Sequence, residues 1–123
     1  FLKNCKSMCD YLVIGVDNDK LVAENKRGSF ISFEKRKMVV GSIRYVDEVR
    51  DSISWNPAVL MSQLVSEGYN LKYYFHGDDK VDPRAVEYIE SVGGEARITP
   101  YVEGISTTYL TGLIVDRGKQ NVR

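Results

Sequence analysis

The chain has 123 residues, a length that fits one domain with a modest core, and we expect a single domain over residues 1–123. Its 17 basic residues balance its 17 acidic residues, which argues against proteins that bind nucleic acid or membrane surfaces through bulk charge, although a small anionic ligand needs only a local cluster. No apolar run has the length of a membrane span and the start shows no signal-peptide pattern, so we expect a cytoplasmic protein without a membrane span.

The first part of the chain predicts the end of a helix, a buried strand and a loop. Residues 1–8 are typical of a helix end, with Cys5 and Cys9 on one face. These two cysteines are too few and too close for a disulfide framework, and we interpret them as reduced, partly buried thiols. The continuous apolar run at residues 11–16 has the length of a strand covered on both faces, and the polar segment at residues 17–28 predicts a loop.

Capping residues mark the starts of three later helices. Ser32 is placed to cap a helix that runs to about Ile43, and Asn56 and Asp82, each followed by proline, cap two more. Between and after these helices we expect short strands in "RYVDEV", "LKYYF" and "EARIT", and a last helix over residues 106–115.

Strands that alternate with helices of this length predict a parallel sheet with right-handed crossovers. The fold class is therefore α/β, with a Rossmann-like parallel sheet flanked by helices. A sheet of this kind ordinarily has a strand ahead of the helix with which this chain opens. We therefore expect the first strand of the sheet to be absent from the given sequence.

Three polar segments follow predicted strands, at the edge where ligands bind in open α/β sheets. They are residues 17–27, "HGDD" at residues 76–79 and "EGISTT" at residues 103–108, and we expect all three to converge on one ligand.

The "EGISTT" segment has the composition of a phosphate cradle. Gly104 allows the backbone to come close to a ligand, while Ser106 and Thr107 stand at a helix N-terminus whose backbone N–H groups are unpaired. The alternative is that Ser106 only caps its own helix, which is the commoner role of such a residue.

Other polar and aromatic residues each allow two interpretations. Lys26 can reach phosphates from its loop or belong to a solvated surface, and Asp78 can contact a ribose or magnesium or form an ordinary turn. His76 can act as a general base or complete a hydrogen-bond network. Trp55 can line a pocket or pack in the core or an interface.

Four of these stretches together resemble a known family in order and spacing. "CDYLVIGVDND", "SFEKRKMVVGSIRYVDEV", "HGDD" and "EGISTT" resemble the cytidylyltransferases that act on glycerol-3-phosphate, ethanolamine phosphate and choline phosphate. The resemblance covers about residues 1–113, and "RYVDEV" together with "EGISTT" is its most specific part.

The resemblance implies a Rossmann-like nucleotidyltransferase that joins CTP to a small phosphorylated alcohol and releases a CDP-alcohol and pyrophosphate. It implies Mg²⁺ carried by the nucleotide, and a homodimer. Catalysis would consist of positioning and charge stabilisation, as in other phosphoryl transfers.

The family pattern also assigns roles to residues of this chain. Lys26, Arg36 and Arg44 would be catalytic, with Arg44 alternatively structural and paired to Asp47 or Glu48. Trp55 and Lys26 would bind the alcohol substrate. The nucleotide would be bound by Asp19, Gly77, Asp78, Gly104, Ile105, Ser106 and Thr107.

The chain departs from the family pattern in three places. The family's His-x-Gly-His pair would lie just before Phe1 and is absent, Tyr101 stands where the family usually has arginine, and Lys80 stands where glycerol-3-phosphate enzymes have tryptophan. Two alternatives therefore stay open: an adenylyltransferase acting on a sugar phosphate, and a non-catalytic nucleotide-binding domain.

Overall fold

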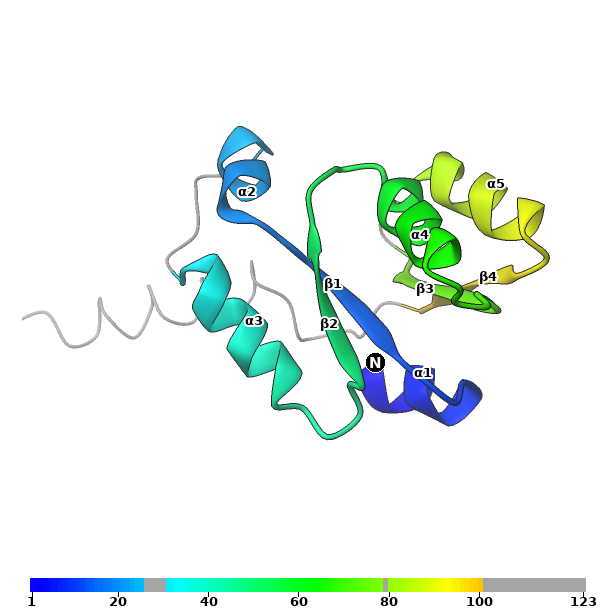
Figure 1. Ribbon diagram of the computed structural model, residues 1–123, viewed down its shortest axis with the longest axis horizontal. Coiled ribbons are helices and arrows are strands. Elements are labelled where there is room, and N and C mark those ends of the chain that lie inside the picture. The colour runs from blue at the N-terminus through cyan, green and yellow to red at the C-terminus, as the bar shows by residue number, and fades with distance from the viewer. Residues whose placement is uncertain (26–30, 79, 101–123) are drawn as a thin grey trace, which may run out of the picture.

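A computed structural model of the chain describes residues 1–25, 31–78 and 80–100, and within this part helices alternate with parallel strands (Figure 1). The predicted α/β class, with parallel strands flanked by helices, is confirmed. The predicted last helix, residues 106–115, lies outside the described residues.

The first elements are α1 (Leu2–Met8), β1 (Val13–Asp17) and α2 (Asp19–Asn25). Cys5 is buried, Cys9 is half-buried and both are free thiols, as the sequence predicts.

The prediction of a loop after β1 is wrong, because α2 forms there. The side-chain oxygen of Asn18 accepts a hydrogen bond from the Leu21 N–H at 2.9 Å and so caps the helix, while the Leu21 side chain is buried. A polar cap and a buried leucine therefore favour a helix in this charged segment.

Helix α3 (Phe33–Gly41) and strand β2 (Glu48–Ser52) follow. Ser32 caps α3 as predicted, since its hydroxyl accepts from the Lys35 N–H at 3.4 Å, and the helix ends two residues before Ile43. The strand begins later than expected, because a turn with a hydrogen bond from the Val46 N–H to the Ile43 carbonyl occupies the start of "RYVDEV".

The second half of the described chain is α4 (Pro57–Ser66), β3 (Tyr73–Gly77), α5 (Pro83–Ser91) and β4 (Glu95–Thr99). Both predicted proline-containing caps are confirmed. Asn56 accepts from the Ala58 N–H at 3.0 Å, and Asp82 accepts from the Arg84 N–H at 2.9 Å.

The strands form two parallel pairs rather than the single sheet that the sequence predicts. Strand β1 pairs with β2 from Val13↔Glu48 to Asp17↔Ser52, and β3 pairs with β4 from Tyr73↔Glu95 to Gly77↔Thr99. In Figure 1, α3 lies beside the first pair, and α4 and α5 lie together beside the second. A strand ahead of Phe1 stays a prediction.

Helix α4 also contacts the first strand pair. A Cβ atom at Gly15 of β1 would lie 2.8 Å from Leu60 Cδ2, so the missing side chain lets the two elements come close. The helix therefore connects the two strand pairs.

The main core lies between α4, α5 and the β3–β4 pair. Ile89 is fully buried between Met61 and Ala85. Partly buried apolar side chains surround this centre: Ala58, Leu71, Tyr74, Tyr88, Val92 and Ala96.

Two adjacent glycines join α5 to β4. Gly93 has a φ of +86° with open space around it, whereas a Cβ atom at Gly94 would lie 2.8 Å from the Lys72 carbonyl oxygen and 2.9 Å from Ile89. The first glycine is needed for its backbone conformation and the second for its lack of volume.

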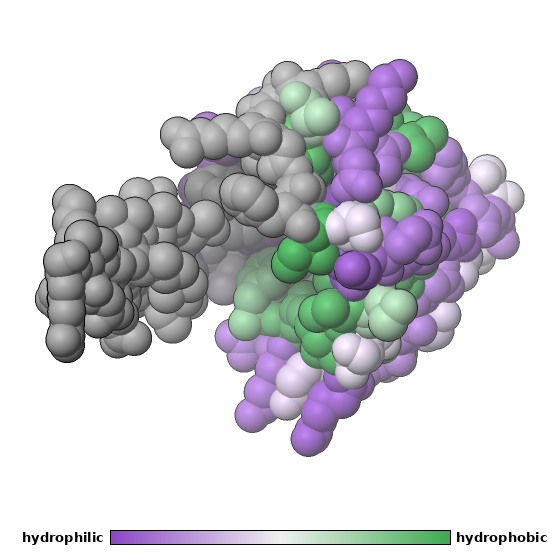
Figure 2. Space-filling view, turned by 90° about the vertical axis from the view of Figure 1, so that its left-hand side faces the viewer, coloured by the Kyte–Doolittle hydropathy of each residue, from purple (hydrophilic) through white to green (hydrophobic). Residues whose placement is uncertain are grey.

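Helix α3 is amphipathic only weakly and has no fully buried residue. Met38 and Val39 on this helix are exposed. Figure 2 views the molecule from the side on which α3 lies, and it shows apolar surface among polar side chains there. No helix in the described ranges is long and apolar enough to span a bilayer.

Candidate functional site

The carboxyl end of β1 is tied to α3 by Arg36. Its Nη1 donates to the Asp17 carbonyl oxygen at 2.8 Å, and its Nη2 donates to Asp19 Oδ1 at 2.7 Å. The other carboxylate oxygen of Asp19 accepts from the Phe33 N–H at 3.1 Å. That backbone donor, followed by Arg36, holds the pKa of Asp19 below its usual value. The structure thus brings together two predicted site residues, Asp19 and Arg36.

The end of β3 carries the "HGDD" turn. His76 Nδ1 lies 2.8 Å from the Gly77 carbonyl oxygen, and the His76 ring lies 5.9 Å from the ring of Tyr74. Asp78 is exposed. Gly77 and Asp78 therefore stand at the carboxyl end of a strand, where the sequence predicts the nucleotide contact.

Trp55 lies in the turn between β2 and α4, with 37% of its surface exposed. Hydrogen bonds of the two residues that flank Trp55 hold the turn. Ser54 Oγ accepts from the Asn56 N–H at 3.1 Å, and Asn56 caps α4. A partly exposed tryptophan on a fixed turn after a strand is available to a ligand.

Arg44 is exposed, and its guanidinium lies over the Tyr45 ring at 5.1 Å. The expected pairing of Arg44 with Asp47 or Glu48 is wrong. Asp47 accepts from Lys6 Nζ and the Leu12 N–H, both at 2.7 Å, and Glu48 is bound by other groups. Lys6 of α1 and Leu12, just before β1, occupy the Asp47 carboxylate with which Arg44 would have paired.

Glu48 belongs to a polar network that the sequence does not reveal. The Tyr69 and Tyr11 hydroxyls donate to Glu48 Oε1 at 2.6 and 2.9 Å, and Arg50 pairs with the same carboxylate. Arg50 also donates two hydrogen bonds to Glu67, at 2.6 and 3.0 Å. The network joins the start of β2 to the end of α4, and a charged residue inside a strand was its only sequence signal.

Hydrogen bonds lower the pKa values of the acids in this network and of the neighbouring Asp47. The Tyr69 hydroxyl, followed by Arg50, lowers the pKa of Glu48, and Arg50 lowers the pKa of Glu67. Lys6, followed by the Leu12 N–H, lowers the pKa of Asp47. Each carboxylate is thus more stable as an anion in the folded chain than in the unfolded chain.

The fold is expected to lose stability in acid for this reason. A carboxylate whose pKa falls on folding contributes stability above its unfolded value, near 4.5 for Glu48, and loses it as the pH drops through the lower folded value. Urea unfolding from pH 7 to pH 3 measures the effect. Glu48→Gln should flatten the acid slope, whereas Glu90→Gln, which removes an exposed carboxylate from the end of α5, should retain it. Equal slopes for Glu48→Gln and the wild type would contradict the expectation.

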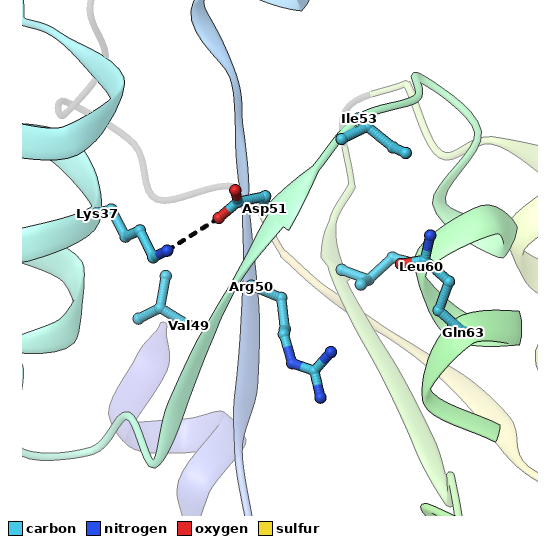
Figure 3. A pocket seen from close by; sticks show the side chains of 7 residues that line it. All are labelled: Lys37, Val49, Arg50, Asp51, Ile53, Leu60 and Gln63. Atoms are coloured by element: carbon cyan, nitrogen blue, oxygen red, sulfur yellow. Dashed lines mark hydrogen bonds and ion pairs between the residues drawn. The ribbon is translucent and has the colours of Figure 1, made fainter. Parts of the chain in front are cut away.

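A shallow groove of about 280 Å³ lies beside β2, between α3 and α4. Figure 3 shows Lys37 and Asp51 joined across one side of it, with Leu60 and Gln63 on the other. The groove contains none of the predicted site residues. It is lined by Lys37, Val49, Arg50, Asp51, Ile53, Leu60 and Gln63.

The predicted phosphate cradle and its lysine are not among the residues that the structure describes. Lys26 lies in residues 26–30, and Gly104, Ile105, Ser106 and Thr107 lie in residues 101–123. The convergence of the three polar segments stays a prediction.

The residues described do not form a metal centre of their own, since no three histidine, cysteine or acidic side chains among them are grouped to hold an ion. At the end of β1, both Asp19 oxygens are already bound by Arg36 and the Phe33 N–H. Among the described residues, this carboxylate is therefore engaged by protein donors and is not part of a group of metal-binding side chains.

Comparison with known proteins found several cytidylyltransferases, and also a bifunctional protein HldE from Chromohalobacter salexigens that is 27% identical over 95% of this chain and 24% of the relative. An ethanolamine-phosphate cytidylyltransferase from Mus musculus is 31% identical over 114 residues, which are 90% of this chain and 27% of the relative. A glycerol-3-phosphate cytidylyltransferase from Bacillus subtilis is 30% identical over 107 residues, 87% of this chain and 78% of the relative. An ethanolamine-phosphate cytidylyltransferase from Dictyostelium discoideum is 27% identical over 135 residues, 97% of this chain and 34% of the relative.

The chain thus spans about a quarter to a third of the two ethanolamine-phosphate relatives and over three quarters of the bacterial one. No protein-family model matches it. Identity of 30% to a protein of which it covers 78%, on an α/β fold with parallel strands and polar turns at their carboxyl ends, shows that the chain belongs to the cytidylyltransferase family.

Proposed function

We propose that the protein transfers CMP from CTP to a small phosphorylated alcohol of the glycerol-3-phosphate, phosphoethanolamine or phosphocholine type, releasing a CDP-alcohol and pyrophosphate. The observation that carries the proposal is the similarity over about nine tenths of the chain to enzymes named for this transfer. The polar turns that end β1 and β3 support it, because ligands of open α/β sheets bind at that edge. Such a product is a precursor for phospholipid or cell-wall polymer synthesis.

In the proposed reaction an oxygen of the substrate phosphate attacks the α-phosphorus of CTP, and pyrophosphate leaves. No group of the protein becomes covalently attached. The protein binds both anions, aligns them and offsets the charge that develops between them.

Different residues of the chain would bind different parts of the two substrates. Gly77 and Asp78 at the end of β3 would contact the nucleoside, and Trp55 after β2 would contact the alcohol. Arg44, which is exposed, would approach a phosphate. The triphosphate would be held by Lys26, Gly104, Ile105, Ser106 and Thr107.

Two further features belong to the proposal. Mg²⁺ would enter bound to the nucleotide, which suits an ion that keeps several waters and binds substrate phosphates. A cytoplasmic location would suit the two free thiols, Cys5 and Cys9.

The test is a pyrophosphate-release assay with CTP, Mg²⁺ and a panel of phosphorylated alcohols, with the CDP-alcohol identified by mass. We expect release with CTP and one alcohol of the panel, and thermal stabilisation of the protein by CTP but not by ATP. Release with ATP and a sugar phosphate would instead establish an adenylyltransferase. Stabilisation by CTP without release from any acceptor would establish a nucleotide-binding domain.

We also propose that two copies associate through the outer side of β2. Strand β2 pairs with β1 along one edge, and no strand of the described ranges pairs with the other. Beside that edge lies the groove of Figure 3, where Ile53 is 58% exposed. Open strand edges and exposed apolar side chains favour association.

Light scattering on a sizing column tests this assembly. We expect a dimer mass for the wild type and a monomer mass for Ile53→Glu at the same concentration, because a carboxylate would be buried without a partner. Ile98→Glu is the matched control, since Ile98 is an exposed isoleucine on β4 and should leave the mass unchanged. A monomeric wild type at high micromolar concentration would refute the dimer.

A further inference from the structure

Arg36 is bound through every nitrogen of its guanidinium. Besides the bonds of Nη1 to the Asp17 carbonyl and of Nη2 to Asp19, its Nε donates to the Ile31 carbonyl oxygen at 3.1 Å. Only 22% of the side chain is exposed. Its charge is paired with a carboxylate, and its fork of donors is fitted to protein acceptors rather than open to solvent.

Asp19 is bound through both of its carboxylate oxygens, while 55% of its side chain is exposed. One carboxylate oxygen accepts from Arg36 and the other from the Phe33 N–H. A carboxylate whose charge is paired with a guanidinium attracts a metal ion less strongly than an unpaired carboxylate does, because its charge is already offset.

These bonds join two places in the chain that the fold must hold together. Asp17 and Asp19 leave the carboxyl end of β1, while Ile31 and Phe33 lead into α3. One arginine, placed on the first turn of α3, thus fixes the start of the helix against the strand end at which the family places its nucleotide.

We propose that Arg36 and Asp19 form a positioning pair that sets the carboxyl end of β1 against the start of α3 and does not itself contact the substrates. The inference rests on the proposed function, and it separates these two residues from the groups that would bind CTP.

The chain offers a matched control at the opposite end of the same strand. Asp47 also accepts from one cation, Lys6, and one backbone amide, that of Leu12. The Asp47 side chain is 31% exposed, whereas that of Asp19 is 55% exposed. Asp47→Asn therefore removes the same kind of contact at the amino end of β1, away from the proposed site.

The experiment compares Arg36→Gln, Arg36→Lys, Asp19→Asn, the double variant Asp19→Asn/Arg36→Gln and Asp47→Asn by steady-state kinetics and thermal unfolding. For Arg36→Gln and Asp19→Asn we expect kcat/KM for CTP to fall on the order of 10²-fold, as for a misplaced binding site, mostly through KM. The double variant should fall no further, because both single changes break one shared contact. Arg36→Lys should recover part of the loss, and Asp47→Asn should lower the melting temperature but keep wild-type kinetic constants.

Three outcomes would overturn the proposal. A large fall in kcat for Arg36→Gln with near wild-type kinetics for Asp19→Asn would mean that Arg36 acts on the reacting phosphates. Recovery of Asp19→Asn by Mn²⁺ or by excess Mg²⁺ would make Asp19 a metal ligand. If Asp47→Asn lost as much kcat/KM as Arg36→Gln and Asp19→Asn, the loss would come from lower stability of the fold and not from the position of the nucleotide site.

A second readout keeps this proposal distinct from the proposed function. If the wild type releases no pyrophosphate with any acceptor, the proposed function fails, and hydrogen exchange still tests the pair. Faster exchange of the backbone amides at positions 33 and 36 in both Arg36→Gln and Asp19→Asn would support the positioning contact. Exchange equal to that of the wild type would overturn it.

Discussion

Replacing Ile89 with alanine is expected to lower the free energy of unfolding by about 2–5 kcal/mol. The side chain is 0% exposed, and it is enclosed by Met61, Ala85 and the backbone at Gly94. Because backbone lies on one side and a helix on the other, the site cannot collapse fully around the smaller residue. Natural domains are stable by only about 5–15 kcal/mol, so this loss is a large share of the total. Equilibrium unfolding in urea measures it.

Met38→Ala is the control for the loss of a large apolar side chain. Met38 is 71% exposed on α3, and its replacement should change the free energy of unfolding by about 0.5 kcal/mol or less. If both variants unfolded at the same urea concentration, the core between α4, α5 and the second strand pair would not be what holds the fold.

The double change Ser106→Ala/Thr107→Val is expected to reduce kcat/KM for CTP by about 10²–10³-fold, the loss typical of removing one donor to a developing anionic charge. The sequence predicts that both hydroxyls lie at a helix N-terminus, where unpaired N–H groups and the helix dipole would favour an anion. The change leaves side chains of similar or smaller size. Steady-state pyrophosphate release measures the loss.

Ser91→Ala supplies the comparison for this pair. Its hydroxyl, at the end of α5, donates to the Tyr88 carbonyl oxygen at 2.6 Å, so its removal takes away a local helix-end bond and no proposed ligand contact. We expect wild-type kinetics from it. Wild-type activity in the double variant together with a lowered melting temperature would show that the segment only caps its own helix.

The starts of three helices were predictable because the signals are local. Ser32, Asn56 and Asp82 each bind a backbone N–H two or three residues ahead, and this short distance is visible in the sequence. The strands were predictable to within a few residues from their apolar content. Alternation of the two kinds of element then led to the parallel pairing that the structure shows.

What could not be predicted depends on contacts between distant segments. The role of Arg36 is set by two backbone carbonyls and one carboxylate, and a carbonyl has no sequence signature. Glu48 was one of two partners predicted for a structural Arg44, but Tyr69 and Tyr11, which lie 21 and 37 positions away, donate to it instead. Helix α2 was missed because its cap, Asn18, lies in a charged stretch that resembles a loop.

The two glycines before β4 impose different limits on how this protein can diverge. At Gly93 the demand is a left-handed backbone in open space, so asparagine or aspartate is tolerated at modest cost and can be fixed by drift. At Gly94 the obstacle is the Lys72 carbonyl, which is already held by the Glu95 N–H at 2.9 Å and cannot give way. Homologues that keep this connection should therefore vary at the first position and remain glycine at the second.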